Sequence, residues 1–388
     1  MTTFQLIYTP ATGWKSADKG NDIPDKTALD RVSIVFFLGD KMLLKEIAES
    51  DFILESFCNA ERVYVSTAGE ICGIQVLDGL VVATAIYFSE TTITATSTNI
   101  KQHSDSESLG SYLLEKFQHP DYKAVMILSD GTFINGSDLV AGCNRANSLN
   151  IPIMGGLAGD GIDFNFTLTG LNQVPEQGNV LAIGFRGKNL QINQFTFGGW
   201  DEFGPERLVT KADKNILYEL DNKNALELYK DYLGKYSNEL PASALLFPLS
   251  VKTNTDQPAV VRTILTIDNI SGTMTFAGNI PVGSTVRLMK ANFDALTFGA
   301  GKLDEVEIPV SLRQNSPQFC FIVSCIGRKI ILKQRIEEEV EAVRELIGNE
   351  ACLTGFYSYG EISVNGISEN CELYNQTITV STFFEPVS

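Results

Sequence analysis

Two acidic residues and two arginines stand where they could bind a charged small molecule. Asp160 follows a glycine-rich turn that contains Gly156, and Glu361 follows a similar turn near the end of the chain. Either carboxylate could pair with an ammonium group, although a turn aspartate can equally cap its own backbone. Arg328 and Arg262 each offer a planar set of donors that suits a carboxylate. We therefore include Asp160, Glu361, Arg328, Arg262 and the turn residue Gly156 in a predicted ligand-binding site.

Each arginine has a structural alternative. Arg328 lies close in sequence to the acidic run 337–339 and could form an ordinary salt bridge with it. Arg262 lies inside an apolar strand, where a charged side chain must either face solvent or be paired. The sequence leaves both alternatives open.

Aromatic, thiol and amide groups complete the predicted site. Tyr357 and Tyr359 alternate along an extended segment, so both rings should face one side, where ring faces attract ammonium groups. Half-buried tyrosines with hydroxyl groups on the backbone are the structural alternative. Cys325 follows a strand, and we expect a buried or pocket-lining thiol there rather than a nucleophile. Asn375 and Gln376 carry amides that could orient a ligand or equally satisfy loop backbone.

The elements that must position these residues form a strand–helix–strand unit that occurs twice in the sequence. An apolar strand at 124–131 leads through a helix to a short strand at 151–160. A second strand at 319–328 leads through a helix to a short strand at 351–361. A helical crossover joins parallel strands, and ligands bind beyond the carboxyl ends of such strands. The two units therefore predict two lobes with a pocket where the lobes meet.

The remaining pattern predicts a mixed fold. Arg31–Leu38 and Arg62–Ala68 are expected strands with two short helical stretches between them, and Leu80–Phe88 with Thr91–Thr98 is an expected antiparallel pair. Antiparallel runs outnumber parallel ones. We expect an α/β (mixed α+β) fold: two related lobes of mixed β-sheets covered by helices, each lobe with one strand–helix–strand unit, in an arrangement that could be layered αββα.

The domain organisation follows from length and from one linker-like stretch. A chain of 388 residues is long for a single core, so two domains are expected. A polar stretch that ends in Pro241 follows a helix stop at Gly234. The expected domains are therefore 1–240 and 241–388.

Composition excludes several classes of function. The net charge of −17 disfavours binding to nucleic acid or to an anionic membrane surface, because both require a basic surface. We find no signal peptide and no apolar run of membrane-spanning length, so a cytoplasmic protein is expected. The seven cysteines lack the paired spacing of a zinc site and should be reduced thiols. No catalytic base or phosphate-binding loop accompanies Cys325, so we expect no enzyme.

Several blocks in order resemble the FIST family, which has an amino-terminal and a carboxy-terminal FIST domain. The resemblance covers roughly residues 30–388. The blocks that carry it are Gly155–Gly161, Gly199–Pro205, Leu217–Asp221, Ala225–Tyr229, Phe276–Pro281, Ser324–Arg328, Gly355–Ile362 and Glu372–Thr377.

The resemblance implies an intracellular sensor of a small molecule, with amino acids or related metabolites as proposed ligands. FIST domains are often linked to histidine kinases, cyclic-dinucleotide enzymes (diguanylate cyclases and phosphodiesterases) or chemoreceptors. Our first hypothesis is a cytoplasmic ligand-binding sensor that acts through such a separate partner and needs no cofactor. A protein-docking scaffold is an alternative that the acidic surface permits.

A haem-based nitric oxide sensor is the other alternative, because some members of the family bind haem. The family commonly has histidine at the position of Tyr374, and only His103 and His119 remain in this chain. Tyrosine and cysteine can also hold haem iron. The departure at Tyr374 lowers the expectation of haem without removing it.

Overall fold

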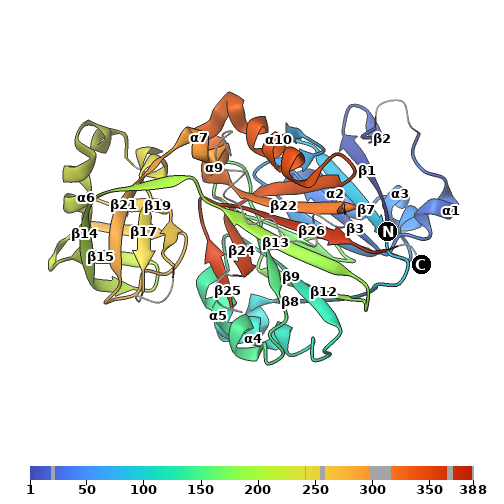
Figure 1. Cartoon of the computed structure of the whole chain (residues 1–388), viewed down its shortest axis with the longest axis horizontal. Helices are drawn as coiled ribbons and strands as arrows, with labels where there is room; N and C mark the ends of the chain where they lie inside the picture. The colour runs from blue at the N-terminus through green and yellow to red at the C-terminus, as the bar shows by residue number, and fades with distance from the viewer. Residues whose placement is uncertain (19–21, 241, 254–257, 298–315, 365–369, 387–388) are drawn as a thin grey trace.

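The protein consists of a large core, which carries both chain ends, and a small lobe built from residues 200–297 (Figure 1). The computed structural model describes residues 1–18, 22–240, 242–253, 258–297, 316–364 and 370–386. The expected mixed α/β class is confirmed. The predicted boundary after Leu240 falls inside the small lobe.

The core contains three strand–helix–strand units, one more than the sequence predicted. In each unit two neighbouring strands run parallel, and the second and third units are the two that were predicted. All three units lie in the core, so the lobes do not hold one unit each. The strand pairs are β3 (Ile34–Gly39) with β4 (Glu61–Ser66), β9 (Tyr122–Ser129) with β10 (Ile153–Leu157), and β22 (Phe319–Cys325) with β23 (Cys352–Ser358).

The three sheets surround one central core instead of stacking in two layers. Phe36, Met126 and Phe321 come from the first strands of the three units and belong to the same buried cluster. Their sequence neighbours alternate to the outer faces, as the pleat of a strand requires. Helices cover those outer faces. They are α2 (Lys41–Ala48) and α3 (Asp51–Ser56) on the first sheet, α4 (Ser106–Leu114) and α5 (Gly136–Ala146) on the second, and α9 (Ile326–Leu332) and α10 (Ile336–Ile347) on the third.

Each unit passes its next strand to a neighbouring sheet. β5 (Glu70–Cys72) follows the first unit and pairs with β23 of the third. β24 (Gly360–Val364) follows the third unit and pairs with β10 of the second. β11 (Thr169–Leu171) follows the second unit and pairs with β4 of the first. The exchange closes a ring, so the three units hold one another in place.

The outer strands also join the two halves of the chain. β13 (Gln191–Phe197) pairs with β26 (Ile378–Phe384), although they belong to opposite halves of the sequence. The other strands of the three sheets are β1 (Thr2–Thr9), β2 (Gly13–Ser16) and β7 (Val81–Tyr87) in the first, β8 (Thr92–Asn99), β12 (Asn179–Arg186) and β25 (Cys371–Tyr374) in the second, and β6 (Gln75–Leu77) in the third.

The small lobe is one strongly curled sheet with its own core. β14 (Trp200–Asp213) is long, carries register shifts and pairs with β21 (Thr285–Ala291) along its first half and β15 (Ile216–Leu220) along its second. The sheet curls so far that its edge strands, β18 (Val260–Arg262) and β19 (Ile264–Asp268), are separated only by Thr263. The remaining elements are β16 (Lys223–Asn224), α6 (Ala225–Leu233), η2 (Gly234–Glu239), η3 (Ala242–Leu246), β17 (Leu249–Lys252), β20 (Thr273–Phe276) and α7 (Phe293–Leu296).

The chain crosses between core and small lobe twice, and the two crossings touch. It enters at Gly198–Trp200 and returns near α7, where the Asn292 amide donates to the Gly199 carbonyl at 3.1 Å. Gly199 has φ +117, and a side chain there would start 2.8 Å from the Leu296 backbone. Close contact of the crossings therefore requires glycine at this position. We call these two crossings the hinge.

Among the residues that the structure describes, no helix has the length and apolar character needed to span a membrane.

Candidate functional site

A cavity of about 1,070 Å³ lies between the core and the small lobe, at the carboxyl ends of β9, β10 and β23. This interlobe cavity is at the upper end of the size range of ligand pockets. The described residues that line it are Gly131–Asn135, Leu157, Ile162–Asn165, Ile330 and Tyr359 from the core, and Asn215, Leu245, Ile264–Thr266 and Phe276–Gly278 from the small lobe.

The first wall is the loop after β9, and Asp130 holds it in place. The buried carboxylate accepts the Thr132 and Phe133 amides at 2.7 Å each, and its second oxygen accepts the Gly178 amide at 2.9 Å. These bonds fix the turn in which Phe133 projects, with 59% of its surface exposed. A large exposed phenylalanine on a pinned turn indicates a contact surface rather than a core residue.

The second wall is the 161–166 loop after β10, and Asp160 anchors it. One carboxylate oxygen accepts the Asn165 and Phe166 amides at 3.1 and 3.0 Å and also the Lys41 ammonium at 2.8 Å. The other oxygen accepts the Tyr359 hydroxyl. Asp160 therefore caps its own loop, which is the structural alternative that the sequence offered.

The environment of Asp160 also sets its charge. Burial alone would raise the pKa of the carboxyl group, but hydrogen bonds from Lys41, Tyr359 and the loop amides outweigh it and hold the pKa below its ordinary value. Burial and the bond to Asp160 raise the pKa of Tyr359. The pair is thus an anionic aspartate that accepts from a neutral tyrosine, and both groups serve the loop.

The 161–166 loop carries backbone strain at the cavity. Phe164 has φ +48, a conformation that costs an aromatic residue about 1–3 kcal/mol. Its ring stacks on Tyr359 at 4.5 Å between centroids and 17° between planes. The strain holds this ring in the lining of the cavity, where 41% of its surface stays exposed.

The lining is mainly apolar, with aromatic rings from both lobes. Phe133, Phe164 and Tyr359 come from the core, and Phe276 comes from the small lobe. Ile162 is 72% exposed. Among the described lining residues, Asp163 is the one with a charged side chain. Such a surface can bind an apolar body by burial and an ammonium group by its rings.

Of the residues predicted from sequence, Tyr359 lies in the described lining of the cavity. Tyr357 is fully buried and donates its hydroxyl to Glu339 at 2.8 Å. Gly156 packs against Val323, where a side chain would approach to 2.6 Å. The two tyrosines therefore have different partners, and Gly156 permits two sheets to pack closely.

Arg328 forms the salt bridge that the sequence offered as its alternative. Its guanidinium donates to Glu339 at 2.8 Å, and both side chains are fully buried. It also donates to the carbonyls of Gly198 and Leu296, which belong to the two crossings of the hinge. Arg328 therefore fastens the hinge to the core.

Arg262 is also paired within the protein. It donates to the Leu373 carbonyl at 2.7 Å and to the Glu372 carboxylate at 3.0 Å, which ties β18 of the small lobe to β25 of the core. It lines a separate, smaller cavity of about 290 Å³ between the lobes. The role of Arg262 as a ligand contact therefore stays a prediction.

Glu361 and Cys325 are buried near Arg328. Glu361 accepts the Ser358 hydroxyl at 2.6 Å and the Thr377 hydroxyl at 2.8 Å, and burial raises its pKa to about 8. Burial likewise raises the pKa of the Cys325 thiol, which disfavours the reactive thiolate.

Asn375 and Gln376 are fully buried, and neither amide has a hydrogen-bond partner among the residues that the structure describes. Gln376 also has φ +61, while Gly79 and Gly178 hold positive φ at the corresponding turns before β7 and β12. A strained residue with an unpaired buried amide is costly and needs an explanation. These two residues stay candidates, although they do not line the described interlobe cavity.

Sequence reasoning missed the residues that form most of the lining. Phe133, Phe164 and Asp163 lie in loops directly after predicted strands, so their position at the strand ends was a usable signal. The contribution of the small lobe, such as Phe276, had no local signal because it depends on how the lobes pack.

The described cavity fits haem poorly. Neither His103 nor His119 lines it; His103 bonds to Thr98 at 2.8 Å, and His119 lies beside Asp121. Tyr359 is in the lining, but a tyrosine ligand must lose its proton, and the pKa of Tyr359 is raised. The described residues also contain no cluster of histidine, cysteine and acidic side chains that could hold a metal ion.

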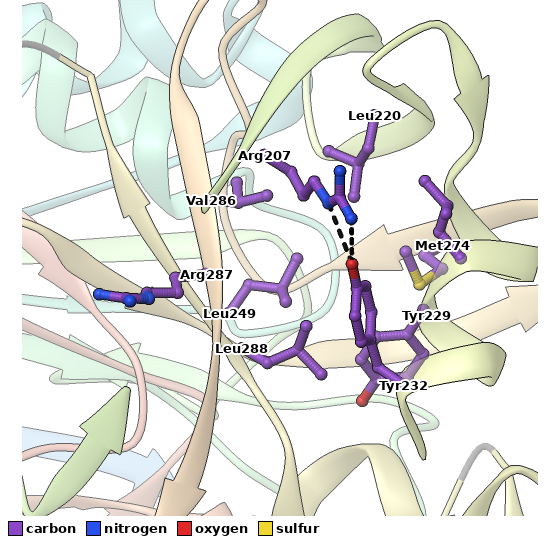
Figure 2. Close-up of a pocket in the computed structure, with 10 residues that line it drawn as sticks. Arg207, Leu220, Tyr229, Tyr232, Leu249, Met274, Val286, Arg287 and Leu288 are labelled. Atoms are coloured by element: carbon purple, nitrogen blue, oxygen red, sulfur yellow. Dashed lines mark hydrogen bonds between the residues drawn. The ribbon is translucent and has the colours of Figure 1, made fainter. Parts of the chain in front are cut away.

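In the described part of the small lobe, the interior cavity is too small for an organic ligand. Figure 2 shows its cavity, with Arg207 donating to the Tyr232 hydroxyl beside apolar side chains such as Leu249 and Met274. The cavity measures about 10 Å³, which is room for about one water molecule.

Comparison with protein families agrees with this architecture. Residues 32–223 match the FIST N domain, and residues 225–364 match the FIST C domain. None of the curated proteins matches the chain significantly. The two matches follow each other along most of the chain, and the protein therefore belongs to the FIST family, whose domains are proposed to bind ligands in signal transduction.

Proposed function

We propose that this protein is a sensor without catalytic activity, which binds a small organic molecule in the interlobe cavity and signals through a separate partner. The observation that supports this most is that both lobes line one cavity of about 1,070 Å³. A ligand that touches both lobes binds one arrangement of the lobes better than another, and this difference shifts the population.

The hinge supports the signalling part of the proposal. Both crossings meet at Gly199 and are fastened by Arg328 to the core. A small lobe that is joined to the core through this hinge and through side-chain contacts such as that of Arg262 with Glu372 can respond as a body to a ligand in the cavity.

The absence of catalysis is supported by the state of the candidate nucleophile. Cys325 is buried and its raised pKa favours the thiol. Asp160, which anchors one wall of the cavity, is occupied by its loop, Lys41 and Tyr359.

An amino acid is the ligand that the family resemblance suggests, and it belongs in any panel. The described lining, however, offers no guanidinium or ammonium for a carboxylate, because Arg328 and Arg262 bond within the protein. A haem-based gas sensor has no structural observation in its favour here. The partner would be a histidine kinase, a cyclic-dinucleotide enzyme or a chemoreceptor by analogy with the family, and a docking scaffold is the alternative if no ligand exists.

The proposal is tested by closing the cavity. Ala277 lines it from the small lobe and is partly exposed. A panel of amino acids, amines and apolar metabolites is screened by thermal shift, and hits are titrated by calorimetry into the wild type and Ala277→Trp. We expect hits to bind the wild type and to lose at least about tenfold in affinity in the variant, because the indole fills their space.

Asn238→Trp is the matched control, since Asn238 is exposed on the small lobe and does not line the cavity. It should bind like the wild type. Equal binding of every hit to Ala277→Trp, or no hit at all with folded protein, would reject the proposed site.

A further inference from the structure

The charge of the interlobe cavity points to one class of ligand. Among the described lining residues, Asp163 carries the one charged side chain, and lysine, arginine and histidine are not among them. The Asp163 side chain is exposed and makes no hydrogen bond or ion pair within the described structure. A carboxylate on a ligand would therefore find no counter-ion in this lining, whereas an ammonium group would find one.

One cation beside the 161–166 loop is not free to reverse this balance. Lys41 lies 2.8 Å from Asp160 and also 4.0 Å from the centre of the Phe166 ring. These contacts hold Lys41 behind the 161–166 loop, and it is not part of the lining. The chain as a whole is acidic, with a net charge of −17, so the long-range field also attracts cations.

Aromatic rings share the lining with Asp163. Phe164 is its neighbour in sequence, and Phe133, on the loop after β9, has 59% of its surface exposed. Ring faces attract organic cations, and aromatic pockets with a carboxylate are a recurrent way to bind quaternary or primary ammonium groups. The strained backbone of Phe164 keeps one of these rings in place.

The size and polarity of the cavity exclude a small hydrophilic cation as its best occupant. A volume of about 1,070 Å³ suits a ligand of many non-hydrogen atoms. Ile162, Leu265 and Phe276 add apolar surface to the lining. Burying an apolar body against this surface supplies most of the affinity.

We infer that the interlobe cavity selects an organic cation with an extended apolar body, with Asp163 facing the ammonium group and Phe133 and Phe164 around it. This inference rests on the proposed function, because it names the ligand class of the same cavity. It goes further by predicting that the sign of the ligand's charge decides affinity.

Three probes with the same body test this: phenylhexyl ammonium, the phenylhexyl alcohol and the phenylhexyl carboxylate. Each is titrated by calorimetry into the full-length protein at neutral pH. We expect the ammonium to bind roughly tenfold more tightly than the alcohol, and the carboxylate to bind most weakly. Equal affinity of all three, or tightest binding of the carboxylate, would overturn the inference.

Variants identify the residues responsible. Asp163→Asn should reduce the preference for the ammonium over the alcohol by about three- to tenfold and leave the affinity for the alcohol unchanged. Phe133→Ala should weaken binding of the alcohol as well as of the ammonium, because it removes apolar contact. Asp231→Asn, an exposed aspartate on α6 outside the cavity, is the matched control and should keep the preference.

The outcomes separate the inference from the proposed function. One outcome is that the alcohol binds, that Ala277→Trp abolishes this binding, and that the ammonium binds no more tightly than the alcohol. The cavity then remains a ligand site, but the inferred preference for a cationic ligand is rejected. A preference for the ammonium over the alcohol that is as large in Asp163→Asn as in the wild type also rejects the inference. No binding of any probe or panel member to folded protein rejects both.

Discussion

One acidic position recurs in the three units and has two different environments. Glu70, Asp160 and Glu361 each follow the second strand of a unit, three residues after Thr67, Leu157 and Ser358. In the first and third units the hydroxyl group donates to the acid, at 2.5 and 2.6 Å. In the second unit leucine replaces the hydroxyl residue, and the acid instead binds Lys41, Tyr359 and its own loop. The unit that departs from the repeat is the one that supplies two walls of the cavity.

The buried acids predict how stability depends on pH. Burial raises the pKa of both Glu70 and Glu361 from 4.5 to about 8. The folded protein therefore holds these protons more tightly than the unfolded chain. Their contribution is complete below about pH 4.5 and is lost as the pH rises through 8, which amounts to a few kcal/mol per group. Urea denaturation should show stability falling from about pH 5 to pH 8.

Glu361→Gln should make this fall about half as steep, because Glu70 remains. Glu385 does not interfere: hydrogen bonds from Ser89, Glu90 and Thr91 lower its pKa to about 2 against the opposing effect of burial, so its contribution is lost only in acid. A stability that stays flat or rises between about pH 5 and pH 8 would show that the two acids are ionised in the folded protein.

Gln376 predicts a stabilising substitution. Its buried amide has no hydrogen-bond partner within the described ranges, and such a group costs about 1–3 kcal/mol. Gln376→Met keeps the length of the side chain and removes the unpaired polar atoms, so the free energy of unfolding should rise by about 1–2 kcal/mol. Chemical denaturation measures this. A loss of stability would mean that the amide is satisfied by a bound molecule such as water.

At the scale of elements, the cavity wall is an insertion into the repeat. β5 begins at Glu70 and β24 one residue before Glu361, whereas β11 begins only at Thr169, nine residues past the acid of its unit. The intervening residues include the 161–166 loop. The proposed ligand site thus lies where one unit interrupts the pattern that the other two keep.

Loosening this loop from outside should weaken ligand binding. Lys41 does not line the cavity but pairs with Asp160, the anchor of the loop. Lys41→Met should speed hydrogen exchange at the Asn165 and Phe166 amides and reduce the affinity of a cavity ligand by about three- to tenfold, because an unordered loop must be ordered on binding. Lys45→Met, an exposed lysine on the same helix, is the control. Unchanged exchange at both amides would contradict the anchoring role of Asp160.

The sequence predicted elements better than their pairing. The parallel pairs 124–131 with 151–160 and 319–328 with 351–361 were expected from strand–helix–strand order and are confirmed. The strands near Arg31–Leu38 and Arg62–Ala68 were also expected, yet their unit went unrecognised as a third copy. Its turn, Thr67 to Glu70, carries the same hydroxyl-to-acid spacing as Ser358 to Glu361. The exchange of strands between units could not be predicted, because non-local pairing leaves no local pattern.

At the scale of the whole molecule, the two halves of the sequence are interwoven in the core. β13 and β26 pair across the halves, and the small lobe takes strands from both sides of residue 240. Arg328 links this core to the hinge. The sequence suggested Arg328 as a ligand contact because of its charge and its position. The carbonyls that it binds belong to distant segments, so only the packing of these segments identifies them.

Breaking the Arg328–Glu339 pair should free the small lobe. Arg328→Met leaves Glu339 buried without a counter-ion and should cost about 3–5 kcal/mol of stability. The double variant with Glu339→Leu removes both charges and should recover much of that cost. Small-angle X-ray scattering of the folded double variant should show a broader distribution of lobe arrangements. A profile identical to that of the wild type would mean that Arg328 does not hold the hinge.

The most direct test of the proposed site is a crystal structure of the protein grown with phenylhexyl ammonium. Density for the probe should fill the interlobe cavity, with its body among Phe133, Phe164 and Phe276 and its nitrogen beside Asp163. Density for the probe elsewhere on the protein, with this cavity holding only solvent, would contradict the assignment of the cavity as the ligand site.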